Sequence, residues 1–401
     1  MGTEIGNHQK LQSNGTRWFD VIVVGGGPSG LYTATLLSNF GLSVVLFEEH
    51  SEIGKGVVCS GVVSKEAFLR YDLPKESIVG KIKDAELFSP GGIRLPYSHP
   101  ETAALVVDRH AFDGKLGERA IASGVEICLN SKVFALSVEN GFVEARLRTP
   151  EGESRTRARI AVIATGVNFK LQTMLGLGRP KKIIKGIQIE TKAGHHTEYL
   201  RVYFGSRFSN GFFGWAIPLM NRRMRIGVMT EGNALEGLKS VLSSIPTNGD
   251  PCTGIVKRRG IAFGSIPRSY SDRIVVVGEA AGHIKTTTGG GIYYGLLGAE
   301  IASDIINKAF KKGDFQSRTL SEYQRLWRKS LGREIVFGEY FHRFYSKLSD
   351  NSIDALFEAA EQDSLLSFIS ENGKFDWHKN AVVRILRSPN LRRVLWNRLI
   401  K

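Results

Sequence analysis

The sequence is poor in cysteine. Cys59, Cys128 and Cys252 are its three cysteines, and no two of them stand at the short spacing of a zinc-binding pair. Three scattered thiols also cannot form a disulfide framework. We therefore expect a protein of the reducing cytoplasm that holds no metal.

Long apolar runs are missing as well. No stretch reaches the roughly 18–20 apolar residues that are needed to span a bilayer. The first seventeen residues are polar and contain no apolar signal segment. The sequence predicts a cytoplasmic protein, soluble or peripheral to a membrane, with a disordered tail over residues 1–17.

Acidic residues are outnumbered by basic ones. The chain has 54 Lys and Arg against 39 Asp and Glu, a formal net charge of +15. Such an excess favours an acidic partner, either nucleic acid, an anionic membrane surface or an acidic electron carrier. Because no zinc finger, RNP-like motif or basic repeat accompanies the charge, we expect no nucleic-acid partner.

An apolar strand followed by a glycine turn is the clearest pattern that the sequence does contain. Residues 21–24 form a β-branched run of the kind that is buried on both faces of a parallel sheet. Gly25, Gly27 and Gly30 then supply G-x-G-x-x-G. In this motif the first glycine permits a tight turn, the second lets a pyrophosphate approach the backbone, and the third packs helix against strand. The pattern predicts a dinucleotide-binding turn.

A second apolar strand, LSVVLFEEH, carries Glu48 eighteen positions after Gly30. An acid at that place binds the ribose hydroxyls of an adenosine in dinucleotide-binding proteins. We take Glu48 as the ligand and its neighbour Glu49 as solvated. The turn and the acid together indicate a bound dinucleotide, without separating NAD from FAD.

The order of patterns along the chain predicts two interleaved domains and a helical end. Residues 183–265 contain four stretches that alternate apolar with polar residues, as half-buried antiparallel strands do. A buried strand and a long helix return after them. We predict a nucleotide-binding domain over residues 18–182 and 266–310, a substrate domain over residues 183–265, and a helical region over residues 311–401.

Several motifs in a fixed order carry a resemblance to a known family. The series G-x-G-x-x-G, acid, DRHAFD, ATG, GWAIP and GEAAG…TGGGI resembles the FAD-dependent geranylgeranyl reductases, which are flavoproteins built like para-hydroxybenzoate hydroxylase. The match spans most of residues 19–345. The resemblance implies an α/β fold with a Rossmann-like, para-hydroxybenzoate hydroxylase-like FAD-binding domain, an inserted antiparallel-sheet substrate domain and a helical C-terminal region. It also implies FAD and the saturation of double bonds in a geranylgeranyl or other prenyl chain of isoprenoid or membrane-lipid metabolism.

The resemblance also implies a set of FAD contacts. The residues concerned, including the glycines of the turns, are Gly25, Gly27, Ser29, Gly30, Glu48, Cys59, Ser60, Arg109, Val133, Gly166, Gly278, Glu279, Gly290, Gly291 and Ile292. Arg109 can bind the pyrophosphate or ribityl region as a fixed fork, unless it forms a surface salt bridge with Asp108 or Asp113. Amides of the glycine run 289–291, which opens the long helix of the nucleotide-binding domain, can stabilise negative charge on the flavin; the alternative is a flexible loop.

Two positions depart from the family pattern. Glu279 stands where the family usually has aspartate, so one extra methylene must be accommodated beside the ribityl chain. In FGWAIP, Phe213, Trp215 and Ile217 fall between the reductase pattern Tyr-x-Trp-x-Phe-Pro and the halogenase pattern Trp-x-Trp-x-Ile-Pro. In either family the segment covers the substrate side of the flavin, so we expect these three residues to bind substrate, unless the segment is an ordinary core strand.

Cys59 and Trp215 are the predicted catalytic residues. Reduction of an isolated alkene adds hydride to one carbon and a proton to the other, with partial positive charge in between. The π face of Trp215 can stabilise that charge. Cys59, as a thiol with an ordinary pKa, can deliver or relay the proton, although a small buried residue that fits against the flavin ring is an equal interpretation.

Other functions stay open on the sequence alone. An FAD-dependent monooxygenase or halogenase of the same superfamily is the alternative enzyme, and a prenyl-binding escort protein without catalysis is the alternative of another class. The chain has no second G-x-G-x-x-G for a nicotinamide. The electron donor can therefore be NAD(P)H or a reduced carrier such as ferredoxin.

The last part of the chain is basic and amphipathic. Residues 379–401 hold no acid, and their cations are Lys379, Arg384, Arg387, Arg392, Arg393, Arg398 and Lys401. Pro389 divides the segment into two predicted helices. Such a segment can lie on an anionic membrane surface or dock on the protein itself with a solvated basic face.

Overall fold

The computed structural model describes residues 16–192, 198–245, 254–363, 365–390 and 392–393. Most of the expected tail, residues 1–17, lies outside these ranges. Its last residue does not belong to a tail, because Arg17 begins the first strand and pairs with Thr156. The tail prediction is therefore wrong at Arg17, where the pairing of two parallel strands extends past the apolar run.

An eight-stranded sheet, counted over the described residues, forms the first half of the molecule. Parallel pairing joins β18, β11, β1, β2 and β8. The path of the sheet is β17 (Tyr270–Ser271), β18 (Ile274–Val276), β11 (Gly152–Ile163), β1 (Arg17–Val24), β2 (Val44–Phe47) and β8 (Glu126–Cys128), with β10 (Phe142–Thr149) and β9 (Lys132–Glu139) added antiparallel beyond β11. Since β1 lies between β2 and the later strand β11, the strand order reverses beside β1, and ligands bind at the carboxyl ends of strands at such a point.

The run of residues 21–24 explains why β1 is central. Successive side chains of a strand point to opposite faces. Val21 and Val23 belong to the core on one face, and Ile22 and Val24 to the core on the other. Both faces of β1 are therefore covered, as the sequence predicted.

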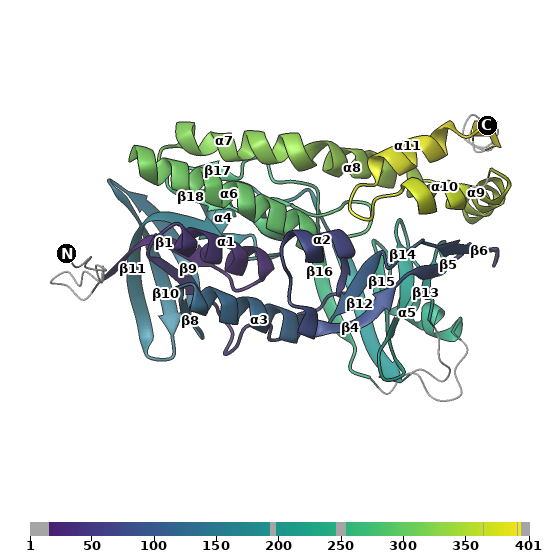
Figure 1. The fold of residues 1–401 in the computed structure, drawn as a ribbon, viewed down its shortest axis with the longest axis horizontal. Helices are drawn as coiled ribbons and strands as arrows, with labels where there is room; N and C mark the ends of the chain where they lie inside the picture. Colours follow the sequence, from purple (N-terminus) through teal and green to yellow (C-terminus); the bar gives the residue numbers. More distant parts are fainter. Residues whose placement is uncertain (1–15, 193–197, 246–253, 364, 391, 394–401) are drawn as a thin grey trace.

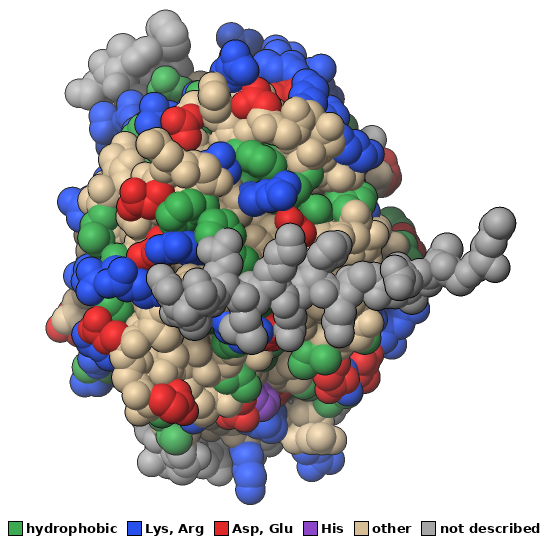
Figure 2. Space-filling view, turned by 90° about the vertical axis from the view of Figure 1, so that its left-hand side faces the viewer, with side chains coloured by type: hydrophobic (Ala, Val, Ile, Leu, Met, Phe, Trp, Pro, Cys, Tyr) green, Lys and Arg blue, Asp and Glu red, His purple; other side chains and the backbone are tan. Residues whose placement is uncertain are grey.

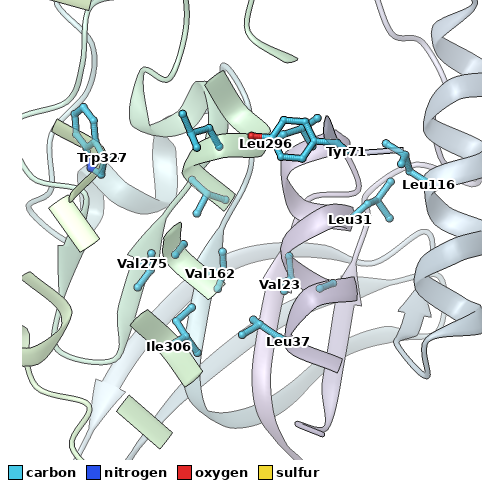
Figure 3. Packing of buried hydrophobic residues seen from close by; sticks show 14 of the residues in the cluster. Val23, Leu31, Leu37, Tyr71, Leu116, Val162, Val275, Leu296, Ile306 and Trp327 are labelled. Atoms are coloured by element: carbon cyan, nitrogen blue, oxygen red, sulfur yellow. The ribbon is translucent and has the colours of Figure 1, made fainter. Parts of the chain in front are cut away.

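Helices cover the first of these faces. Val23, Val162 and Val275, from three neighbouring strands, pack with Leu37 and Ile306 (Figure 3). The helices of this layer are α1 (Pro28–Asn39), α3 (Arg109–Ala122), α6 (Ile292–Lys312) and α7 (Ser317–Trp327). On the other face the core is completed by residues of β9 and β10 and by Leu171 of the short α4 (Lys170–Met174).

A second large sheet has seven strands, counted over the described residues. Its order is β16 (Lys257–Phe263), β12 (Lys182–Lys192), β15 (Arg223–Thr230), β14 (Phe213–Leu219), β13 (Leu200–Tyr203), β5 (Asp84–Phe88) and β6 (Arg94–Ser98). The four strands expected from alternation pair antiparallel with one another, and α5 (Ala234–Ser243) packs on one face. Two strands of residues 84–98 join through β5 and β13, although the predicted substrate domain was confined to residues 183–265. The two paired strands are more than 100 residues apart in the sequence. No local pattern of residues could therefore predict that β5 joins this sheet.

A small sheet and the C-terminal helices complete the arrangement. The three-stranded sheet has the order β3 (Val62–Ser64), β7 (Ala104–Val107) and β4 (Ile78–Ile82), and α2 (Lys65–Arg70) follows β3. After α7, a π-helical turn leads into α8 (Arg333–Tyr345), so that α7 and α8 run along both large sheets (Figure 1). The remaining helices are α9 (Asp350–Gln362), α10 (Leu365–Asn372) and α11 (Lys379–Arg387).

The excess of basic residues does not form a continuous patch at the end of the molecule that carries β10 and β11. Figure 2 shows Lys and Arg side chains there interspersed with Asp and Glu. Arg146 and Arg155 lie 3.5 and 3.6 Å from Glu153 and Glu144, respectively. Separately, no helix within the described part of the chain is long and apolar enough to cross a membrane.

Candidate active site

A single cavity of about 910 Å³ brings the predicted site residues together. It is lined by the glycine turn after β1, by the loops that follow β2 and β18, and by strands β12 to β16 of the second sheet. Every residue predicted to bind cofactor or substrate lines this cavity except Gly30. The volume lies near the upper end of the roughly 300–1,000 Å³ of ligand pockets.

The glycine turn has the geometry that its sequence predicts. Gly25 has φ of +109°, and a Cβ there would lie 2.6 Å from the Ala164 carbonyl oxygen. A Cβ on Gly30 would collide with the carbonyl oxygen of Gly25, which explains why Gly30 is buried between helix and strand instead of lining the cavity. By contrast, a Cβ on Gly27 would meet nothing within 4 Å. Gly27 thus leaves an open cradle at the N-terminus of α1, where a pyrophosphate can approach the amides.

Glu48 lies directly beside this turn. Its Oε2 accepts a hydrogen bond from the Gly26 amide at 2.7 Å, and its Oε1 accepts one from the His50 amide at 3.0 Å. The carboxylate therefore stands at the end of β2, next to the glycine turn and on the cavity wall. This is where an acid can bind a ribose.

Glu279 occupies a second corner of the cavity. Its Oε1 accepts a hydrogen bond from the Ala262 amide at 3.1 Å, and its Oε2 accepts one from Arg259 Nη2 at 2.5 Å. Gly166 lies opposite, since a Cβ added there would be 3.5 Å from Arg259 Nη2. The longer side chain of glutamate thus spans from the loop after β18 to strand β16 of the second sheet.

Three strands of the second sheet hold the loop that carries Cys59. Arg259 donates a hydrogen bond to the carbonyl of Val58 at 3.3 Å, and Gln188 donates one to the carbonyl of Cys59 at 3.1 Å. Arg225 donates to the carbonyl of Ser60 at 2.6 Å. Three consecutive carbonyls are therefore fixed by side chains from β16, β12 and β15.

These three polar side chains were absent from the sequence prediction. A signal for two of them exists, because Gln188 and Arg225 are buried polar residues with apolar neighbours on both sides in their strands. Buried polar groups need partners. Their partners in the Cys59 loop are more than 100 residues away in the chain, so the sequence pattern alone could not name them.

Arg109 forms a buried ion pair at the start of α3. Its Nε and Nη2 donate to the two oxygens of Asp113 at 2.9 and 2.8 Å, and the side chains are only 10% and 1% exposed. Burial alone would lower the pKa of Arg109, but Asp113 and the Cys59 thiol raise it, so the guanidinium stays charged. The salt bridge of Arg109 with Asp113 that the sequence suggested is therefore buried and bidentate, and it lies on the cavity wall.

The electrostatic surroundings of Cys59 make its thiol more acidic than an ordinary one. Burial raises the pKa of the thiol, but the Arg109 guanidinium, the Gly61 amide and Arg259 together lower it below its usual value. The Gly61 amide donates to the sulfur at 3.3 Å. The expectation of an ordinary pKa is thus corrected by two cations that the fold brings to the loop.

The substrate-side residues share one face of β14. Phe213, Trp215 and Ile217 alternate along the strand and line the cavity, whereas Ala216 points into the core beneath α5. Gly227 stands opposite Trp215 on β15, and any side chain there would collide with the indole ring. The absence of a side chain at Gly227 therefore makes room for Trp215.

Apolar and aromatic side chains form most of the cavity wall around this face. The contributing residues come from β5, β13, β15 and α8 and from the segment before and within α11. They are Leu87, Leu200, Val202, Phe204, Met229, Phe341, Tyr345, Phe375 and Val382. The glycine run before α6 borders this chamber, since a Cβ on Gly289 would lie 2.8 Å from Met229 Sδ. The predicted cofactor site and the apolar chamber are therefore continuous.

The residues present fit FAD. The open cradle at Gly27, an acid at the end of β2, the buried cation Arg109 and the N-terminus of the long α6 suit a ribose, a pyrophosphate and an anionic ring edge. Across the described ranges, no cluster of three or more His, Cys, Asp and Glu side chains is placed to hold a metal ion.

Comparisons with known proteins agree with this geometry. The family described as FAD dependent oxidoreductase matches residues 20–167. Digeranylgeranylglycerophospholipid reductase 2 of Methanothermobacter thermautotrophicus is 29% identical over 94% of this chain and 98% of its own length. The digeranylgeranylglycerophospholipid reductase of Methanosarcina acetivorans is 27% identical over 95% of this chain and 99% of its own.

Solved structures share the fold over nearly the whole chain. A geranylgeranyl bacteriochlorophyll reductase-like protein from Thermoplasma acidophilum superimposes with a TM-score of 0.83 and 21% identity, covering 95% of this chain and 98% of that one. A flavin-dependent brominase gives a TM-score of 0.70 with 14% identity, over 94% of this chain and all of that one (100%). The comparisons confirm the resemblance, the fold class and FAD as the cofactor that the sequence predicted.

Proposed function

We propose that this FAD-dependent oxidoreductase saturates carbon–carbon double bonds in the prenyl chains of a digeranylgeranylglycerophospholipid or a related lipid. The observation that carries the proposal is the continuity of two environments in one cavity. One end has the polar contacts for a dinucleotide, and the other is an apolar chamber beside the same glycine run. The names of the relatives from Methanothermobacter and Methanosarcina support the lipid class.

The apolar chamber suits a long hydrocarbon. A prenyl chain of about twenty carbons offers on the order of 16 kcal/mol of gross burial at ~0.8 kcal/mol per carbon, of which association and ordering consume a large part. Phe213 and Trp215 present rings to this chamber from β14, and Phe204 presents one from the end of β13. Apolar contact alone can therefore hold such a chain without polar recognition along its length.

The proposed reaction assigns a different role to FAD, to Cys59 and to Trp215. FAD, when bound, supplies the hydride that goes to one alkene carbon. Cys59 gives the proton to the other carbon; its position on the cavity wall and its thiol, which is more acidic than usual, support this role. Trp215 faces the chamber and can stabilise the partial positive charge between the two additions.

Anaerobic incubation with reduced enzyme and a digeranylgeranylglycerophospholipid tests this function. Mass spectrometry should show a gain of two hydrogens for each bond reduced. A second incubation with oxygen and halide serves as the control. Products that carry oxygen or halogen would identify a monooxygenase or halogenase, and purified protein without flavin would identify an escort protein.

Two partners complete the proposal. The electrons come from NAD(P)H or from a reduced carrier such as ferredoxin, and stopped-flow bleaching of the flavin by each donor distinguishes them. The lipid is drawn from an anionic membrane surface, with α11 beside the chamber as the docking element. Val382 of α11 lines the cavity, and the side chains of Arg384 and Arg387 are exposed.

A further inference from the structure

The segment between α10 and α11 is fastened to the glycine-rich loop before α6. Lys285 Nζ lies 2.7 Å from Asp376 Oδ1, and Thr287 Oγ1 lies 2.6 Å from His378 Nδ1. Each contact joins residues 91 positions apart in the chain. The loop that borders the predicted flavin site is therefore tied to residues 374–379.

The ion pair is buried. The side chains of Lys285 and Asp376 are 7% and 2% exposed, respectively. The ammonium also lies 4.7 Å from the centre of the Phe375 ring, and the Asp376 carbonyl accepts a hydrogen bond from Tyr294 Oη at 2.9 Å. Burying both charges costs free energy of desolvation. We therefore expect a function of this pair in addition to joining the two segments.

The two charges are placed unequally with respect to the cavity. Lys285 lines it and Asp376 does not. The ammonium is also close to the glycine run, because a Cβ added to Gly290 would lie 2.7 Å from Lys285 Cε and 3.3 Å from Nζ. The positive end of the pair thus faces the place where Gly290 and Gly291 border the cofactor site.

Other groups around the ammonium add no charge on the cavity side. His378 lines the cavity near Lys285, but burial, assisted by the Lys285 charge, lowers its pKa to about 4 and keeps the imidazole neutral at pH 7. Thr286, Thr287 and Thr288 are uncharged. Lys285 therefore brings a positive charge to the glycine run from the cavity wall.

We propose that Lys285 stabilises the negative charge that bound FAD gains on reduction, and so raises the reduction potential of the flavin. A charge held in a buried site acts more strongly than one in water, and it needs no reorganisation when the flavin is reduced. The inference rests on the FAD assignment and not on the prenyl substrate. Its test therefore involves no lipid and is independent of the proposed function.

The experiment measures the two-electron potential of FAD bound to the full-length protein, by dye-coupled anaerobic titration at pH 7. Lys285→Met should lower the potential by about 30 mV or more, which is a tenfold change in the ratio of affinities for reduced and oxidised FAD. Lys285→Gln, which keeps a donor for Asp376, should lower it similarly. Lys374→Met is the matched control, because Lys374 is exposed on the segment that carries Asp376, and the potential of this variant should equal that of the unchanged protein.

The affinity for oxidised FAD gives a second readout. It should change by less than about threefold in all variants, since the interaction favours the reduced form. An unchanged potential in both Lys285 variants would overturn the proposal. An equal shift in Lys374→Met, or loss of oxidised FAD from both Lys285 variants alone, would overturn it as well, since the residue would then act on the fold or on cofactor binding in general.

Discussion

Arg259 Nη2 donates a hydrogen bond to Glu279 Oε2 at 2.5 Å, and this contact joins the second sheet to the predicted ribityl corner of the FAD site. Glu279 stands where the resemblance to the geranylgeranyl reductases predicted aspartate. The extra methylene lets one carboxylate accept from both Arg259 and the Ala262 amide. The glutamate at this position therefore has hydrogen-bond partners in strand β16.

Replacement of Glu279 tests this corner. Glu279→Ala should weaken FAD binding by roughly 1–3 kcal/mol, because a ribityl hydroxyl and the Arg259 guanidinium would both lose their acceptor. Glu279→Asp is the matched control and should retain most of the affinity. Fluorescence titration of the apoprotein measures both. A dissociation constant unchanged in Glu279→Ala would show that this acid does not touch the cofactor.

The open cradle at Gly27 predicts a purely steric effect. Purified protein should be yellow with non-covalent FAD, and Gly27→Val should abolish FAD retention, because the new side chain would fill the space left for the pyrophosphate. Gly114→Val is the control, since a Cβ at Gly114 also meets nothing within 4 Å but Gly114 does not line the cavity. Absorbance at the flavin band and circular dichroism report cofactor and fold. A folded Gly27→Val variant with full FAD content would refute the placement.

Cys59 should matter more for the second half of the reaction than for the first. Cys59→Ala should bind FAD and accept electrons at the normal rate but reduce the alkene about 100-fold more slowly, within the usual range for a lost general acid. Cys128→Ala, on the edge strand β8, should alter neither rate, because Cys128 does not line the cavity. Single-turnover measurement of both half-reactions separates the steps. Equal rates in Cys59→Ala and the unchanged protein would show that the thiol only packs against its neighbours.

The lowered pKa of Cys59 predicts a pH dependence with a definite sign. A proton donor must be protonated, so alkene reduction should slow as pH rises through the thiol's pKa. Because Arg109 and Arg259 lower that pKa, the decline should begin at lower pH than for an ordinary thiol. The rate of alkylation by iodoacetamide, in a Cys252→Ser background, should rise at correspondingly low pH for Cys59. For Cys128 it should rise only near pH 11, since burial and Glu126 raise that pKa to about 11.

The buried ion pair on α3 predicts a large loss of stability when it is broken. Asp113→Ala should lower the free energy of unfolding by about 3–5 kcal/mol, because Arg109 would keep an uncompensated buried charge. Glu118→Gln breaks the exposed pair with Lys115 on the same helix and should cost less than about 1 kcal/mol. Urea unfolding of the two variants provides the comparison. Equal losses would mean that burial of the Asp113 pair has no energetic consequence.

The basic end of the chain predicts binding to anionic vesicles. Replacing Arg384, Arg387, Arg392 and Arg393 by Gln should weaken co-sedimentation by up to ~1 kcal/mol per residue while FAD stays bound. Deleting residues 379–401 is a blunter test, because it also removes Val382 from the cavity wall. Replacing Arg146, Arg148, Arg155 and Arg159 removes the same charge at the other end of the molecule. Identical sedimentation of both quadruple variants would indicate that α11 docks only on the protein.

The predicted helix pair at this end is described only in part. Residues 379–387 form α11 as expected from the basic amphipathic pattern. The second predicted helix, with Leu391, Leu395 and Leu399, falls largely outside the described residues. Its place on a membrane or on the protein stays a prediction.

Local patterns determined much of this protein from the sequence alone. The β-branched run and the three glycines predicted β1, its turn and α1, because strand burial and close approach depend on residues that are neighbours in the chain. Alternation along residues 213–217 predicted a strand, and the resemblance to the reductases named the side chains that share its cavity face. A strand's period of two is a property of the backbone and needs no tertiary contact.

Tertiary structure alone decided which distant groups meet. The pairing of β5 with β13, the hold of Gln188, Arg225 and Arg259 on the Cys59 loop, and the contact of Lys285 with Asp376 all join residues more than 90 positions apart. The lowered pKa of Cys59 is a consequence of such meetings. Electrostatic interaction depends on distance in space and on burial. A linear pattern contains neither quantity. The sequence therefore named candidate residues of the site, and the fold determined their charges and partners.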